Sequence, residues 1–396
     1  MPSNVFDIIL LSSCALSLGV WIYLFLFHHF FWLKLTIPAI DSSIIFANKK
    51  VVAIVPARNE GDVIFQTLHS LLQQQGHLLE KIIVINDNSD DNTAAEIDRL
   101  MLEDNQQKIL LIQGKPLTKG WTGKLWAIQQ GFEKLRQIYP NYDANFFVWL
   151  TDADIVHQPV CLSRLMQIAT QQNKDMVSLM VKLSCKTFWE KLLIPPFVYF
   201  FQKLYPFRAV NSKTSAAAAA AGGCILIRRK ILEDIGGISS IRNQLIDDCA
   251  LAKQVKKING QLWLGLTNDS MAVRPYKNLS SIWNMVVRSA YRQLNYSWIF
   301  LMLTTFGLIV TYIFPWCLLL VAIFFSSWVV FGLSLLIIAI MTITFIPTAR
   351  LYHLTPLWFF LLSFSAFLYM LMTINSAYLH RRGRGGNWKG RLQADV

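Results

Sequence analysis

Long uncharged apolar segments lie at both ends of the chain. Residues 8–27 contain no charged side chain, and residues 299–347 and 356–379 contain none either. A helix of ~20 apolar residues is long enough to cross the hydrocarbon core of a bilayer. We therefore expect an N-terminal transmembrane anchor within residues 1–34 and about three C-terminal transmembrane helices over residues 299–379.

The middle of the chain has shorter apolar runs that alternate with helical patterns. Four runs are mainly apolar and predict buried strands, at residues 51–55, 81–85, 109–113 and 145–150. The segment between the first two runs has apolar residues at the spacing of one helix face: Ile64, Leu68, Leu71 and Leu72. Buried strands that alternate with helices predict an α/β domain over residues 50–280, with a Rossmann-like, mostly parallel sheet covered on both faces.

Residues 188–207, FWEKLLIPPFVYFFQKLYPF, are apolar enough to be taken for a further membrane span. Charged residues such as Glu190 and Lys203 interrupt the segment, and Pro195-Pro196 would break a helix. We expect an amphipathic segment that lies in the membrane interface without crossing. A helix in the core of the domain is the alternative.

The charge balance indicates contact with a membrane surface. The chain of 396 residues has 37 Lys and Arg against 24 Asp and Glu, a formal net charge of +13. In an apolar chain this favours an anionic membrane face over nucleic acid. Basic residues flank the spans at Lys34 and at Arg288 and Arg292, within an expected interfacial helix over residues 281–298. The positive-inside rule then places the domain in the cytoplasm of a multi-pass inner-membrane protein.

The basic tail, residues 380–396, conflicts with that topology. Three later crossings would leave it outside, so either one apolar segment does not cross fully or the rule fails here. We expect the former, which keeps the tail cytoplasmic. In it Trp388, Lys389 and Arg391 offer a stacking face and two cations, which suit a diphosphate or a sugar ring. A plain basic anchor on anionic lipid is the alternative.

Several motif classes are missing from the sequence. The six cysteines form no C-x-x-C pair, so we expect reduced thiols and neither structural zinc nor a disulfide framework. There is no P-loop and no G-x-G-x-x-G turn after a strand, which speaks against a Walker-type NTPase and a Rossmann dehydrogenase.

Polar residues gather where the predicted strands end. The string PARNE, residues 56–60, follows the first strand, Asp87 follows the second, and Asp152 and Asp154 follow the fourth. Carboxyl ends of parallel strands meet at one edge, where ligands bind. Two carboxylates one residue apart repel unless a cation lies between them. Their hard oxygen ligands would suit Mg²⁺ or Mn²⁺, although aspartates are also common in loops after strands.

Three further features could carry chemistry or be structural. Lys124 lies at a helix start, where the helix dipole disfavours a cation unless a phosphate binds there; a solvated lysine is the alternative. The run of small residues that ends in Gly222 and Gly223 either forms a low-complexity helix or allows close backbone approach to a ligand or strand at the two glycines. Asp247 and Asp248 begin an amphipathic helix, either as favourable N-terminal residues or as a general base tuned by its neighbour.

Together these motifs resemble the family 2 glycosyltransferases of the GT-A fold, in order and over roughly residues 50 to 300. Longer strings resemble the hopanoid-associated (hopene-associated) glycosyltransferases: GWTGKLWA, LTDADIVH, FWEKLLIPPFVYFFQKLYPF, AAGGC and LIDDCALA.

The resemblance implies a role for each matching residue. The nucleotide-sugar, a UDP-sugar, would be bound at Pro56, Ala57, Arg58, Asn59, Glu60, Asp87, Lys124, Asp152, Gly222 and Gly223. Asp87 would read the nucleobase, and Asp154 with Asp152 would meet the diphosphate-bound divalent metal. Asp248, beside Asp247, would act as the base in an inverting displacement.

The resemblance is incomplete near the membrane. Members that form polymers or glycolipids carry Gln/Arg-x-x-Arg-Trp, whereas this chain has Arg288 and Arg292 without the adjacent Trp. This departure puts processive polymerisation in doubt and leaves both arginines as candidate acceptor or diphosphate contacts.

The expected function is transfer of one sugar to a membrane lipid, as part of hopanoid synthesis. Another lipid acceptor, such as a polyprenyl phosphate, a carotenoid or a ceramide-like lipid, is the alternative. A sugar nucleotidyltransferase would need a Gly- and Arg-rich pyrophosphate loop after the first strand, which PARNE is not. The intact aspartate pairs argue against a non-catalytic membrane scaffold.

Overall fold

The computed structural model describes residues 5–41, 46, 48–383, 387–388 and 391–392. They form two units. The helical unit comprises Met1–Lys34, Cys185–Arg208 and Tyr276–Gly385, and the sheet unit comprises Leu35–Ser184, Ala209–Pro275 and Gly386–Val396.

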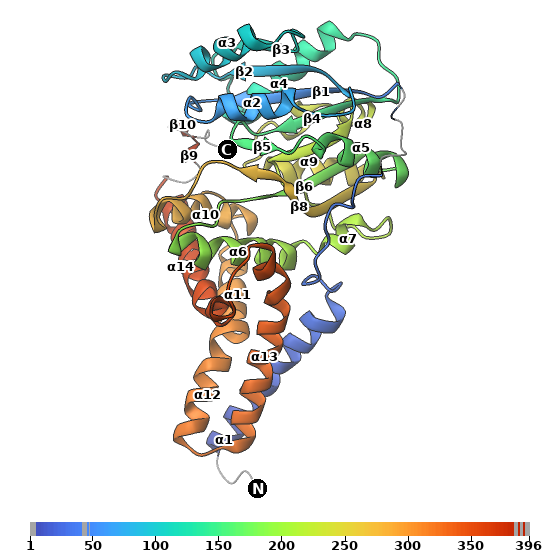
Figure 1. The fold of residues 1–396 in the computed structure, drawn as a ribbon. Helices are drawn as coiled ribbons and strands as arrows, with labels where there is room; N and C mark the ends of the chain where they lie inside the picture. The colour runs from blue at the N-terminus through green and yellow to red at the C-terminus, as the bar shows by residue number, and fades with distance from the viewer. Residues whose placement is uncertain (1–4, 42–45, 47, 384–386, 389–390, 393–396) are drawn as a thin grey trace. The chain divides into compact units, whose positions relative to one another are not determined.

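The sheet unit is built on an eight-stranded sheet with the order β3-β2-β1-β4-β7-β6-β8-β5 (Figure 1). Its strands are β1 Lys50–Ala57, β2 Leu79–Asn86, β3 Ile109–Gln113, β4 Phe146–Thr151, β5 Ile155–His157, β6 Met176–Lys182, β7 Cys224–Arg228 and β8 Leu262–Ala272. The pairs β1–β2, β2–β3, β1–β4 and β6–β8 are parallel, whereas β7 runs antiparallel to β4 and β6, and β5 antiparallel to β8. The predicted mostly parallel α/β sheet is confirmed.

Helices of the sheet unit bury their apolar faces against this sheet. They are α2 Ile64–Leu72, α3 Thr93–Glu103, α4 Gly123–Ile138, α5 Cys161–Gln171, α8 Arg229–Asp234, the 3-10 turn η2 Ile238–Ile241 and α9 Asp247–Lys257. On α2, Ile64, Leu68 and Leu71 are fully buried, as their spacing predicts. Burial of one such side chain contributes about 1.5–3 kcal/mol, so the apolar face fixes how the helix lies on the sheet.

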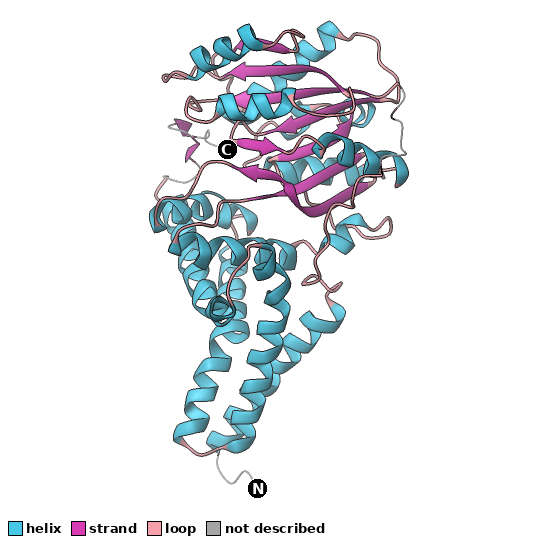
Figure 2. Cartoon of the chain, viewed as in Figure 1, coloured by secondary structure: helices cyan, strands magenta, loops and turns pink. Residues whose placement is uncertain are grey.

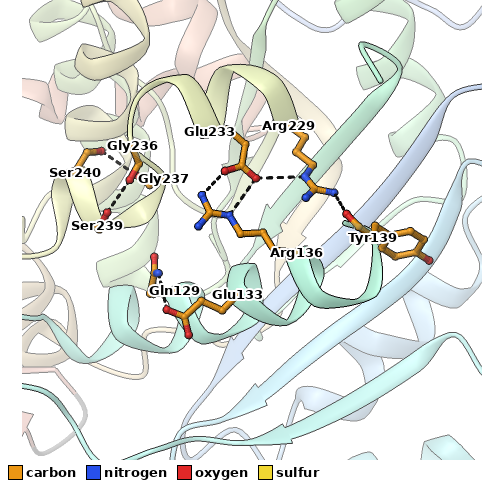
Figure 3. Close-up of polar contacts among 10 residues, drawn as sticks. All are labelled: Gln129, Glu133, Arg136, Tyr139, Arg229, Glu233, Gly236, Gly237, Ser239 and Ser240. Carbon is orange, nitrogen blue, oxygen red and sulfur yellow. Dashed lines mark hydrogen bonds and ion pairs between the residues drawn. The ribbon is translucent and has the colours of Figure 1, made fainter. Parts of the chain in front are cut away.

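A polar cluster holds the C-terminal end of α4. The Arg136 guanidinium donates to the Glu233 carboxylate on α8, which also accepts from Arg229 at 3.4 Å (Figure 3). Arg229 in turn donates to the main-chain oxygen of Tyr139, 2.6 Å away, at the end of α4. With this end fixed, the direction of α4 determines where Lys124, in its first turn, can reach.

Among its described residues, the helical unit contains four stretches long and apolar enough to cross a membrane; its helices are drawn in Figure 2. They are Val5–Phe27, Trp298–Phe324, Trp328–Leu351 and Pro356–Arg381. They comprise α1 Val5–Ile22 with η1 Tyr23–Phe27, α11 Trp298–Leu308 with η3 Ile309–Ile313 and α12 Phe314–Phe324, α13 Trp328–Leu351, and η4 Pro356–Leu361 with α14 Leu362–Arg381. These lengths and compositions match the predicted spans and indicate membrane association. The remaining helices are α6 Phe188–Leu204, α7 Phe207–Asn211 and α10 Leu279–Gln293.

Helix α6 runs without a break through Pro195-Pro196, so the expectation that these prolines would end a helix was wrong. Pro196 has no N–H for the carbonyl of Leu192, four residues earlier. The Ser365 hydroxyl of α14 donates to that carbonyl at 2.7 Å. The Tyr369 hydroxyl likewise donates to the next carbonyl along the helix, at 2.8 Å. The Ser365 hydroxyl of a neighbouring helix therefore replaces the backbone donor that Pro196 lacks.

Glu190 interrupts the apolar pattern of this segment for a local reason. Its fully buried carboxylate accepts hydrogen bonds from the backbone N–H groups of Lys186 and Thr187, and from that of Tyr276 at 2.8 Å. Thr187 and Glu190 form a capping box at the start of α6. The charge thus belongs to a helix cap. Helix α6 is not among the four stretches with span-like length and composition.

Ser365→Ala should lower the stability of the helical unit, because the Leu192 carbonyl then keeps neither donor. A lost hydrogen bond of this kind costs about 1 kcal/mol. The measurement is the midpoint of thermal unfolding in detergent. Pro196→Ala supplies a backbone N–H, so Ser365→Ala should cost less in that background. Equal losses in both backgrounds would contradict the assignment.

Candidate functional site

A cavity opens in the sheet unit where β1 and β4 end and β7 begins. Its polar lining consists of Lys124, Thr151, Asp152, Gly222, Asp247 and Asp248. Pro56 and apolar side chains such as Leu125 and Ile241 complete the wall. The sequence analysis predicted five of these polar residues, and also Pro56, as site residues from motifs that lie far apart in the chain. The fold brings these residues together.

Lys124 is the cation at the centre of this group. Its Nζ lies 2.7 Å from Asp152 Oδ1 and 3.3 Å from Asp247 Oδ2, and its side chain is 19% exposed. Burial alone would lower the pKa of Lys124, but the two carboxylates outweigh it and raise that pKa above its ordinary value. Lys124 is therefore an ion-paired ammonium in the first turn of α4, and not a solvated surface lysine.

The Asp248 carboxylate is held by two backbone amides. The Gly222 N–H donates to Oδ2 at 2.8 Å, and the Cys249 N–H donates to Oδ1 at 2.7 Å. Burial and the neighbouring Asp247 charge raise the pKa of Asp248 to about 7, although the amides and Lys124 oppose this rise. A Cβ on Gly222 would lie 3.4 Å from both Asp248 Oδ2 and Lys124 Nζ, so glycine leaves open the space between them.

Asp152 and Asp154 lie in the turn between β4 and β5. Both are partly exposed, and the main-chain oxygen of Asp154 accepts from Val273 N–H at 2.9 Å. Two partly exposed carboxylates one residue apart fit a hard divalent cation that keeps open positions for a ligand. Asp152 lines the cavity, with one oxygen already engaged by Lys124, whereas Asp154 is not among the cavity residues.

The PARNE turn and the Asp87 loop are joined by hydrogen bonds. Arg58 Nη1 donates to the main-chain oxygens of Asp87, at 2.5 Å, and Asn88, at 2.9 Å. The Asp87 N–H donates to Ala57 O at 2.8 Å, and the Asp90 N–H donates to Asn59 Oδ1 at 2.9 Å. Asp87 itself is fully buried. The two motifs therefore form one rigid rim at the ends of β1 and β2.

Arg274, which the sequence analysis missed, joins this rim to the Asp-x-Asp turn. Its guanidinium pairs with the buried carboxylate of Glu60, the last residue of PARNE. The preceding Val273 donates to the main-chain oxygen of Asp154, and 42% of the Arg274 side chain is exposed. No motif surrounds Arg274, and only its position just after a strand could have signalled it.

Gly223, Arg288 and Arg292 are not among the residues that line the cavity. Gly223 packs its backbone against Val181, where a Cβ would lie 3.1 Å from two methyl groups. Arg288 and Arg292 lie on α10 in the helical unit. Trp388 and Arg391 are paired residues of an antiparallel hairpin, β9 Asn387–Trp388 and β10 Arg391–Leu392. Lys389 lies outside the described residues.

Comparison with known proteins finds similarities for the sheet unit and for the fold. Residues 52–236 match the family model of Glycosyl transferase family 2. The fold is similar to that of mannosyltransferase PcManGT from Pyrobaculum calidifontis, solved with GDP-Man and Mn²⁺, at 14% identity and a TM-score of 0.55, over 95% of this chain and 100% of that one. Glucosyl-3-phosphoglycerate synthase from Mycobacterium tuberculosis matches more weakly, at 14% identity and a TM-score of 0.40, over 66% of this chain and 86% of that one. No curated protein matches the chain. Residues 52–236 are thus similar to Glycosyl transferase family 2, and the mostly parallel sheet is consistent with the GT-A fold.

Asp248→Asn should change how stability depends on pH. In the wild type the folded protein holds the Asp248 proton up to about pH 7, whereas an unfolded aspartate releases it near pH 4. Stability of the wild type therefore falls as pH rises between these values, and the variant lacks this loss. In thermal unfolding without metal or nucleotide, the stability of the variant relative to the wild type should increase from pH 4 to pH 8. A constant difference across that range would contradict the raised pKa.

Proposed function

We propose that the chain is a membrane-bound, inverting glycosyltransferase that moves a sugar from a nucleotide-sugar to a lipid acceptor of the hopanoid class. The observation that carries the proposal is the cavity in which Asp248, held by the Gly222 amide, lies beside the Lys124–Asp152 pair. A carboxylate that can take a proton and a cation that can face a phosphate are thus within one site, as glycosyl transfer from a diphosphate donor requires.

The donor would bind along the rim of β1 and β2 and across Lys124. The residues that would contact it are Pro56, Ala57, Arg58, Asn59, Glu60, Asp87, Lys124, Asp152, Gly222 and Gly223. Residues 56–60 would cradle the nucleoside, expected to be that of a UDP-sugar, and Asp87 would read the base. The Lys124 ammonium would pair with a diphosphate oxygen. The N-terminal end of α4 would also favour a phosphate there.

Asp154, with Asp152 beside it, would hold Mg²⁺ or Mn²⁺. When bound, such a metal neutralises charge on a departing diphosphate. The complex of PcManGT with GDP-Man and Mn²⁺ supports this pairing of nucleotide-sugar and metal on a similar fold. Arg274, exposed beside the turn of Asp154 and paired with Glu60, adds a second positive charge at this edge of the site.

Asp248 would act as the general base. A pKa near 7 is well matched to proton transfer at neutral pH, because the group is partly ionised yet basic enough to accept a proton. It would take the proton of the acceptor hydroxyl as that oxygen attacks the anomeric carbon. The bond from this carbon to the diphosphate oxygen breaks on the opposite face, so one displacement inverts the configuration. Asp247 would orient Lys124, which it contacts at 3.3 Å.

A lipid acceptor is proposed from the helical unit and from the longer sequence strings. The four span-like helices would keep the site at the membrane, with the domain on the cytoplasmic side of the inner membrane. Arg288, Arg292 and the tail residues Trp388, Lys389 and Arg391 are further candidates for acceptor or diphosphate contacts. Another lipid acceptor is the alternative, and a sugar nucleotidyltransferase is less well supported because Glu60 and its neighbours form no pyrophosphate loop.

The first prediction concerns the metal at Asp154. Purified protein should bind a nucleoside diphosphate more tightly with Mn²⁺ or Mg²⁺ than without, and Asp154→Ala should abolish this gain. Calorimetric titration measures both affinities. Asp234→Ala, at an exposed carboxylate of α8, is the matched control and should keep the gain. Metal-independent binding by wild type and Asp154→Ala alike would reject the assignment.

The second prediction concerns the product and the base. Lipid extracts of a strain lacking this chain should lack one glycolipid, which the wild-type chain restores and Asp248→Asn does not. In vitro, Asp248→Asn should reduce transfer about 10²–10⁴-fold while donor binding stays near normal, because only the proton acceptor is lost. Asp247→Asn should be milder. Loss of transfer in Asp247→Asn alone would show that Asp247 is the base and Asp248 the orienting residue. Full transfer in both variants would show that the pair only caps the helix.

A further inference from the structure

A buried polar network lies next to the site but has no part in the chemistry described above. It consists of Thr151, His157, Ser270 and Cys161, each 2% exposed or less. Thr151 ends β4 directly before Asp152, His157 is the last residue of β5, Ser270 pairs with it on β8, and Cys161 begins α5. Four polar side chains from four elements thus meet in the core.

The hydrogen bonds of this network have a fixed direction. Thr151 Oγ1 donates to the main-chain oxygen of Gly223 at 2.9 Å, and its only proton is used there. The bond between Thr151 Oγ1 and His157 Nε2, 2.8 Å long, must therefore be donated by the imidazole. With a neutral ring, Nδ1 then accepts from the Ser270 hydroxyl at 2.9 Å. From donor to acceptor, the hydrogen bonds therefore run from Ser270 to His157, then to Thr151 and then to Gly223.

The last carbonyl of this order belongs to the turn that holds Asp248. Gly223 follows Gly222, whose N–H donates to the Asp248 carboxylate. On the other side of the turn, the Ser178 hydroxyl is bonded to both N–H and C=O of Ala221, at 2.8 and 3.1 Å. The Gly222 amide is therefore fixed between two residues, each anchored by a buried hydroxyl.

We propose that Thr151 and His157 are positioning residues for the base: through Gly223 they fix the Gly222 amide that holds the Asp248 carboxylate. The inference rests on the proposed role of Asp248. Thr151 also directly precedes Asp152 in the chain. Thr151 therefore links the donor side of the cavity to the side that carries the base. The residues act through the backbone and touch no reacting atom.

A metal centre is the competing explanation of this cluster. Ligand atoms of His157, Cys161 and Cys224 lie within 4.8 Å of one another. A metal would need thiolates and a free imidazole lone pair. However, both ring nitrogens of His157 face hydroxyl groups, at 2.8 and 2.9 Å. Trp149 Nε1–H also donates to Cys224 Sγ at 3.4 Å. Hydrogen bonding accounts for every polar atom of the group.

The test compares Thr151→Val with Thr151→Ser in the full-length chain. Valine keeps the shape but removes the hydroxyl, so kcat should fall about 10- to 100-fold, as small misplacements of catalytic groups do, while KM for the nucleotide-sugar stays the same. Serine keeps the donor and should retain most of the wild-type rate. Rates are expressed per nucleoside-diphosphate site counted by titration, which removes any effect of unfolded protein. Equal rates in the two variants would overturn the proposal.

A second comparison separates positioning from a general structural role. Because the network acts through Asp248, Thr151→Val should cause no further loss of transfer in an Asp248→Asn background. The same fold-loss in both backgrounds would overturn the proposal while leaving Asp248 as the base. If Asp248→Asn itself transfers at the wild-type rate, the proposed function and the inference fail together.

His157 gives an independent check. His157→Gln retains an N–H that can reach Thr151 and should keep more transfer than His157→Leu, which should resemble Thr151→Val. Metal analysis of purified wild type completes the design. Stoichiometric metal that is lost both in Cys161→Ser and in His157→Gln would show that the cluster holds a metal, and would overturn the network.

Discussion

The contact on which the site depends is the one between Lys124 and two carboxylates. Asp152 comes from the end of β4 and Asp247 from the start of α9, and Lys124 Nζ lies within 3.3 Å of both. Two unit charges 4 Å apart interact by about 4 kcal/mol where the effective dielectric constant is about 20. Without the ammonium, the acidic side chains of this half-buried cavity would repel one another. The position of α4, and hence its anchoring through Arg136, is therefore part of the site.

In this arrangement, two neighbouring carboxylates of one helix turn have different partners. Asp247 faces Lys124 and stays in the ion-pair cluster, whereas Asp248 faces backbone amides and has a pKa of about 7. Neighbouring residues of the same type thus acquire different properties from the groups that they contact. The glycine at 222 makes this possible, because its amide reaches one carboxylate while the missing side chain leaves the space in front of Lys124 open.

The sheet, the spans and most of the cavity could be predicted because their signals are local. Apolar runs and helical spacing indicate the elements. Asp152 follows a strand, and residues that follow neighbouring parallel strands lie at the same edge of the sheet. The partner of Lys124 could not be foreseen, because contact between α4 and Asp247 depends on packing between distant segments. Arg274 has no motif around it. The unbroken α6 depends on Ser365, a donor far along the chain that no rule about Pro195-Pro196 could include.

That dependence has a consequence for how the protein is made. The Leu192 carbonyl of helix α6 has a side-chain donor only when Ser365 is in place, and Ser365 belongs to α14, the last long helix that the structure describes. During synthesis α6 emerges well before α14, so its open carbonyl at Leu192 stays without a protein donor until translation is nearly complete. A fragment that ends before α14 would retain every residue that lines the cavity but would lack Ser365, so the Leu192 carbonyl of its α6 would have lost this donor.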